Sequence, residues 1–204
     1  MKRLRPKARF KELIKPDQYV VTSAALSDRL RILRDSRGGM SAKLANGYQI
    51  TVREIDPRYV VRDTVTGLLT RESVQDIKRV VSRAFKKVLG RDAEFMFIIE
   101  QQDKAGGLTA PHIHALALHP FMSNVIPKLR PKFYKIAGTD DPKTVHFQLL
   151  TRIGSHPMEY SPAETHFRGA ASYAVKNDFS EAYRSKALMV HVHAFFERYK
   201  ERFR

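Results

Sequence analysis

The chain contains no cysteine. Disulfides, thiolate-bound zinc and cysteine nucleophiles are therefore excluded, and any metal ion must be held by histidine and carboxylate side chains. Long apolar runs are missing too: nowhere do 18 consecutive apolar residues occur, and the basic N-terminus, MKRLRPKARFKELIKPD, lacks the apolar core of a signal peptide. We therefore expect a soluble, cytoplasmic protein.

Two nucleotide-binding signatures are missing as well, and acidic residues are few compared with basic ones. Neither GxxxxGK(S/T) nor GxGxxG occurs, which excludes the phosphate loop of an ATPase and a dinucleotide fingerprint. Only 21 Asp and Glu stand against 37 Lys and Arg, a formal net charge of +16. This excess favours a polyanionic partner, because phosphate contacts release condensed counterions. Nucleic acid is the leading candidate. An anionic membrane surface comes second, since no long basic amphipathic helix with bulky apolar anchors supports it.

The charge and the length suggest how the chain is divided. The 204 residues, 43% of them hydrophobic, suffice for one domain with a core plus an extension. Residues 1–44 carry 12 Lys and Arg against 4 Asp and Glu, half of the total net charge. We predict a basic N-terminal extension over 1–45, which is either an arm for phosphate contacts or a solvated tail. A main domain over 46–180 and a C-terminal helix over 181–204, packed on or flanking it, complete the division.

Apolar patterning predicts the strands. Alternating or continuous apolar runs lie at 48–55, 94–100, 111–120 and 145–150. The second and third runs flank QQDKAGGLTA, a glycine-bearing loop, and so suggest an antiparallel hairpin. A hairpin at the centre of mixed strands and helices favours an α+β domain, a central antiparallel sheet covered by helices, over a parallel doubly wound fold.

Helices are predicted from spacing and caps. The clearest follows the capping residue Thr70, and shorter patterns lie at 26–37 and 182–200. SPAE, residues 161–164, is a capping box for a further helix. Only a short helix is predicted after the third strand, because that stretch is interrupted by three prolines: Pro120, Pro127 and Pro131.

The third strand carries the first candidate site, PHIHALALHP. In a strand, side chains at i and i+2 share a face, so His112 and His114 would stand side by side. Glu100 ends the preceding strand, and a hairpin would bring its carboxylate to the two imidazoles. Two neutral nitrogens and one anionic oxygen suit Mg²⁺, Mn²⁺ or another divalent ion acting on a phosphate oxygen. The alternative is an apolar strand with two structural histidines.

A second candidate lies in GAASYAVKND. On a helix Tyr173 and Lys176 are i and i+3 and share a face, so a phenol and an ammonium would meet one phosphate. A phenol with a pKa of about 10 needs a nearby cation and a metal-polarised phosphate to attack phosphorus. The alternative is an amphipathic helix with the tyrosine half buried and the lysine in solvent.

Glu100, then His112-Ile113-His114, then Tyr173-Ala174-Val175-Lys176, in that order, resembles the HUH endonucleases, specifically the single-tyrosine initiators of rolling-circle replication. The resemblance covers about residues 46–180. It implies an HUH-Rep type fold with a five-stranded antiparallel sheet, and a metal ion on Glu100, His112 and His114. The family's threonine-containing first motif is matched loosely by YQITVRE.

The resemblance also implies an activity. Tyr173 would nick single-stranded or hairpin origin DNA of a plasmid or phage, Lys176 would steady the phosphate or the tyrosinate, and the products would be a 5′-phosphotyrosine and a 3′-OH primer. The chain lacks the helicase domain of many viral relatives, so host helicase and polymerase would be partners. Two-tyrosine members carry a second tyrosine one helical turn after the first, where this chain has Asn177, which favours a single-tyrosine enzyme. Tyr183, ten residues after Tyr173, is a candidate for a secondary role only.

Several alternatives stay open. A single-tyrosine HUH transposase would share the site, and a non-catalytic DNA-binding initiator or repressor would share the charge. A histidine-triad hydrolase would need histidine at Leu116, and a cupin would need a glutamate soon after His114. The second HxH, His191-Val192-His193, has helical spacing, which points its histidines about 200° apart and argues against chelation. The remaining histidines, read as structural or solvated, are His119, His146, His156 and His166.

Overall fold

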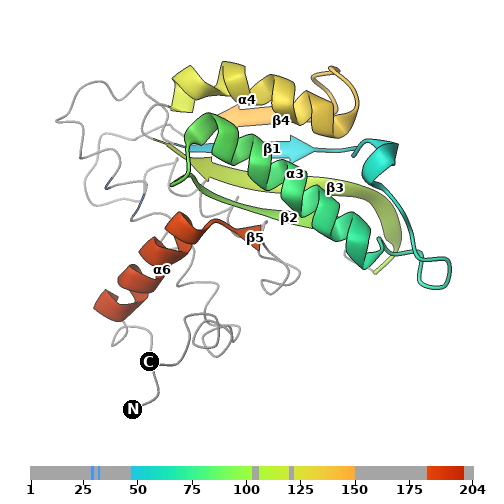
Figure 1. The fold of residues 1–204 in the computed structure, drawn as a ribbon, viewed down its shortest axis with the longest axis horizontal. Coiled ribbons are helices and arrows are strands. Elements are labelled where there is room, and N and C mark those ends of the chain that lie inside the picture. Colours follow the sequence, from blue (N-terminus) through green and yellow to red (C-terminus); the bar gives the residue numbers. More distant parts are fainter. Residues whose placement is uncertain are drawn as a thin grey trace, which may run out of the picture.

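The computed structural model describes Arg29, Ile32 and residues 47–102, 106–119, 122–149 and 183–199. Five strands and three α-helices make up this part, together with a short 3₁₀ helix, η1 (Pro57–Tyr59). The strands are β1 (Gly47–Val52), β2 (Glu94–Gln102), β3 (Leu108–Leu118), β4 (Val145–Leu149) and β5 (Tyr183–Arg184). The helices are α3 (Arg71–Leu89), α4 (Met122–Ala137) and α6 (Lys186–Tyr199). The predicted α+β class is confirmed (Figure 1).

The strands form one antiparallel sheet in the order β4-β1-β3-β2-β5. β2 and β3 are the predicted hairpin, and both lie inside the sheet. Their pairing extends further toward the loop than predicted, to Gln102 opposite Leu108. β5 was not predicted, because two residues are too few to show alternation.

The main core lies between the sheet and the layer of α3 and α4. α3 begins after its predicted cap Thr70, whose hydroxyl accepts from the Ser73 amide, and is closed by Gly90, which has a positive φ of 92°. Phe85 of α3 stacks on Phe95 of β2 with ring centroids 4.5 Å apart, and meets Phe133 of α4 edge-on. These two helices cover one face of the sheet (Figure 1).

α4 corrects the prediction of a short, proline-broken helix. It runs unbroken for 16 residues with Pro127 and Pro131 inside it. Each proline removes one backbone donor at a cost of about 3 kcal/mol in a helix interior. Both prolines lie on the exposed side, where water can reach the carbonyls they leave. The opposite side buries an apolar stripe, which outweighs that cost: Ile126, Leu129, Phe133 and Ile136.

The second face of the sheet is packed by α6. Ser185 joins this helix to β2: its hydroxyl accepts from the Phe95 and Leu188 amides, and its own amide donates to the Phe95 carbonyl. α6 contacts β2 and buries Leu188, Val192 and Phe195, as its spacing predicted. Its helical course confirms that His191 and His193 do not share a face.

Some predicted segments fall outside the described residues. These are the SPAE capping box, the YAVK helix and most of the basic extension. Arg29 of that extension is described, and its guanidinium pairs with the Glu94 carboxylate of β2, Nε to Oε2 at 2.7 Å. The division into three segments stays a prediction. Among the helices that are described, none combines the length and apolar character needed to cross a membrane.

Candidate metal centre

The hairpin register sets Glu100 directly opposite His112. Because side chains alternate along a strand, Glu100, His112 and His114 all point to the face of the sheet away from α3 and α4. Ile113, between the two histidines, faces the core and is fully buried. One apolar residue thus fixes the direction of both imidazoles, since turning them inward would expose it.

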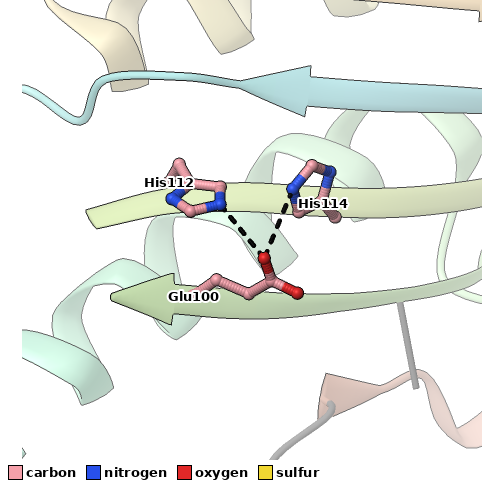
Figure 2. A group of neighbouring side chains, drawn as sticks. All are labelled: Glu100, His112 and His114. Atoms are coloured by element: carbon pink, nitrogen blue, oxygen red, sulfur yellow. Dashed lines mark hydrogen bonds and ion pairs between the residues drawn. The ribbon is translucent and has the colours of Figure 1, made fainter. Parts of the chain in front are cut away.

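The three side chains converge on one point (Figure 2). Glu100 Oε2 lies 3.1 Å from His112 Nε2 and 3.6 Å from His114 Nε2, and the ligand atoms all lie within 4.8 Å of one another. Two atoms bound about 2.1 Å from one ion at angles of about 90° to 120° are about 3.0 to 3.6 Å apart. The two separations from Glu100 Oε2 match that range, so the donor set can hold a divalent metal ion.

The other nitrogen of His112 is held by the backbone. His112 Nδ1 lies 3.0 Å from the Ala110 carbonyl oxygen, which can only accept, so Nδ1 carries a proton. Nε2 is then the nitrogen that faces Glu100, and either a proton or a metal ion must lie between it and the carboxylate. A metal ion in that position would leave the imidazole neutral, as ligation requires.

A β-bulge sets the Ala110 carbonyl in place. The register shifts between Glu100 and Gln102, and the extra residues of β3 include Pro111, which has no amide to donate to a ladder. The Arg62 guanidinium links the bulge to the loop that precedes α3. It donates to the Thr109 carbonyl at 2.9 Å and to the Gly67 carbonyl at 2.6 Å. The bulge is therefore braced from outside the hairpin.

His114 is the more buried imidazole. Its Nδ1 lies 3.4 Å from the hydroxyl of Thr51, the residue directly opposite on β1. Burial, and secondarily the neighbouring His112, lowers the pKa of His114 to about 4. His114 is therefore neutral at physiological pH and ready to coordinate. Thr51, the threonine of the YQIT segment in β1, thus lies next to the cluster.

The structure brings together three of the five predicted site residues: Glu100, His112 and His114. Tyr173 and Lys176 lie outside the described residues. Tyr183 is described, and it stacks on Phe97 with ring centroids 5.0 Å apart, on the face of the sheet opposite the cluster.

His146, which the sequence placed among the structural or solvated histidines, is exposed on the face of the sheet that carries the cluster. On β4 it pairs with Thr51 in register, so His146, Thr51 and His114 form a row across the cluster's face. His146 is exposed and two strands from His114, about 10 Å by strand spacing. Only the strand order reveals this placement, because β4 lies beside β1 in the sheet although it follows β1 in the sequence by almost 100 residues.

No protein-family model matches the chain, and no curated protein matches its sequence. Among solved structures, it is similar to the catalytic domain of the adeno-associated virus type 5 Rep protein. That likeness has a TM-score of 0.33 and 12% identity, and covers 66% of this chain and 100% of that one. Similarity at this level assigns neither family nor activity to this chain.

The buried His114 predicts a pH dependence of stability. Its pKa is about 4 in the folded chain and about 6.5 when unfolded, so below pH 6.5 the unfolded chain takes up a proton that the folded chain does not. The neutral His114 therefore contributes about 3 kcal/mol to the free energy of unfolding above pH 6.5, and this contribution is lost as the pH falls to 4. Urea titrations in EDTA should show this loss. His114→Gln should lack that part of the slope, and an unchanged slope would contradict the buried neutral imidazole.

The Thr51 contact predicts an effect on metal affinity. Thr51→Val keeps a β-branched side chain in β1 but removes the hydroxyl facing His114 Nδ1. Partners that orient metal-bound histidines contribute about 10- to 100-fold to affinity, and at 3.4 Å we expect the lower end. Calorimetric titration with Mn²⁺ measures the change. Equal affinity in the two proteins would show that Thr51 does not orient the ring.

Proposed function

We propose that the protein is a metal-dependent endonuclease and strand transferase that nicks single-stranded DNA through Tyr173 to initiate rolling-circle replication. The observation that carries the proposal is the convergence of Glu100, His112 and His114 on one point of an antiparallel sheet. The HxH pair and the downstream YxxK motif supply the rest.

The cluster would hold Mg²⁺ or Mn²⁺ through Glu100 Oε2 and the Nε2 atoms of both histidines. When bound, such an ion polarises a non-bridging oxygen of the scissile phosphate. Glu100 and His114 are each only 8% exposed, so two ligands are sheltered. The His112 side chain is 23% exposed and marks the open side from which a phosphate would approach.

Tyr173 would then perform the transfer. Its phenolic oxygen loses a proton and forms a bond to phosphorus, the bond from phosphorus to the 3′-oxygen breaks, and that oxygen takes up a proton. The products are a 5′-phosphotyrosine and a free 3′-OH that a polymerase can extend. Lys176 would stabilise the phosphate or the tyrosinate by its charge. Because the phosphotyrosine bond retains the energy of the broken one, rejoining needs no ATP.

One experiment tests this proposal. The protein is incubated with Mn²⁺ and a panel of single-stranded oligonucleotides from its own replicon, and the products are separated under denaturing conditions. A protein–DNA adduct that resists denaturation, formed with one oligonucleotide and prevented by EDTA, is the expected result. Binding without any adduct across the panel would favour a non-catalytic initiator instead.

A further inference from the structure

A basic groove lies on the opposite side of the sheet from the metal cluster. It has a volume of about 600 Å³ and lies between α3 and the edge strand β5, where Tyr183 forms part of its wall. In Figure 1, α3 lies over the sheet and β5 is the short strand at the edge of the sheet, beside β2. The groove is lined by five cationic side chains of α3 and one hydroxyl: Lys78, Arg79, Arg83, Lys86, Lys87 and Ser82.

The positive charge of this groove is largely uncompensated. Among the residues described, no acidic side chain lines the groove. One of its cations, Arg79, forms an ion pair with Asp76 at 2.9 Å. Arg83, Lys86 and Lys87 are exposed. From Lys78 to Lys87 the helix rises about 13 Å, so its cations are spread along the groove rather than gathered at one point.

Ser82 adds an independent observation. It is 8% exposed and lines the groove, and within the described part of the chain its buried hydroxyl has no hydrogen-bond partner. A buried hydroxyl without a partner destabilises a fold unless a ligand or ion satisfies it. Alanine is the better helix former at such a position, so folding alone does not account for this serine.

We propose that this groove binds the phosphodiester backbone of DNA, with Ser82 donating a hydrogen bond to a phosphate oxygen. The groove and the metal cluster lie on opposite faces of one sheet, so DNA in the groove is a different segment from the strand at the metal ion. The protein thus holds its substrate at two places. The proposal does not depend on cleavage.

Two matched triple variants test the charge. The groove variant carries Arg83→Gln, Lys86→Gln and Lys87→Gln, and the control carries Lys128→Gln, Lys132→Gln and Lys135→Gln on α4. Both remove three charges from the same helical layer, but only the first set lines the groove. Fluorescence anisotropy in EDTA, with one duplex and one single-stranded oligonucleotide over a range of salt, gives affinity without nicking.

We expect the groove variant to lose at least about tenfold in affinity, with the salt slope reduced by about 2 to 3, and the control to lose less than about threefold. A larger loss with the duplex identifies flanking double-stranded DNA as the occupant, and a larger loss with the single strand identifies the displaced strand. Equal losses in both variants would show that only net charge matters, and would overturn the proposal.

Ser82→Ala tests the hydroxyl without changing the charge. We expect a melting temperature equal to or above that of the wild type, and DNA affinity about three- to tenfold weaker. Unchanged affinity would remove Ser82 from the site. If the wild type forms no covalent adduct but the groove variant still loses DNA affinity, the proposed nicking activity is wrong and the groove proposal holds. If the wild type forms the adduct but the groove variant keeps its DNA affinity, the groove proposal is wrong and the nicking activity holds.

Discussion

Tyr173→Phe is expected to abolish both cleavage and the covalent adduct. The substitution removes one oxygen and keeps the ring, so the fold should survive at a cost of about 1 kcal/mol or less if the hydroxyl makes no buried hydrogen bond. No phosphotyrosine ester can form without that oxygen, so neither cleaved DNA nor adduct should be detectable on a denaturing gel. DNA affinity should stay within about twofold, because binding comes from the basic residues.

The matched control for this variant is Tyr183→Phe. Tyr183 lies on the face of the sheet opposite Glu100, His112 and His114, so at saturating DNA, where its place in the groove wall does not limit binding, removing its hydroxyl should leave the yield of adduct unchanged. Mass spectrometry of the wild-type adduct should map the DNA to Tyr173, joined through the 5′-phosphate end that the cut leaves. An adduct that persists in Tyr173→Phe, or a map to Tyr183, would overturn the nucleophile assignment.

The double variant His112→Ala, His114→Ala has the second largest expected effect. It removes two of the three proposed metal ligands, so Mn²⁺ binding should be lost in a calorimetric titration. A bound metal ion contributes several kcal/mol to the transition state, and each 1.36 kcal/mol is tenfold, so nicking should fall by at least about a thousandfold. Binding to the oligonucleotide should change little.

The chain contains its own control for that experiment. His191→Ala, His193→Ala removes the same two side chains at the same spacing, but from α6, where they do not share a face. This control should bind Mn²⁺ and nick as the wild type does. Normal nicking by the His112, His114 variant in the presence of EDTA would show that the metal site is wrong.

The hairpin and its cluster were predictable because two local signals agree. Alternation in PHIHALAL directs both histidines to one face, and the short connection from EFMFIIE requires an antiparallel neighbour that brings Glu100 alongside. The supports of the imidazoles were not predictable. The Ala110 carbonyl depends on a bulge, and Thr51 depends on which strand pairs with β3.

α4 and the basic groove show two other limits. The prolines led to the prediction of a short helix after the third strand, whereas burial of the apolar side of α4 keeps the helix continuous in the folded chain. For the groove, the sequence directed attention to the charge of residues 1–44. The cations of α3 became a candidate site only when β5, almost 100 residues further on, was placed beside them.

The opposition of Glu100 and His112 makes metal affinity a reporter of strand alignment. A slip of β2 against β3 by one residue would turn the carboxylate or the imidazoles toward the core, and the chelate would be lost together with the buried position of Ile113. A ligand that binds only the native alignment stabilises it, by about 2.7 kcal/mol at a hundred times its dissociation constant. Divalent ions should therefore act on this protein as a folding ligand, raising its melting temperature and selecting one pairing of its central hairpin before any DNA is bound.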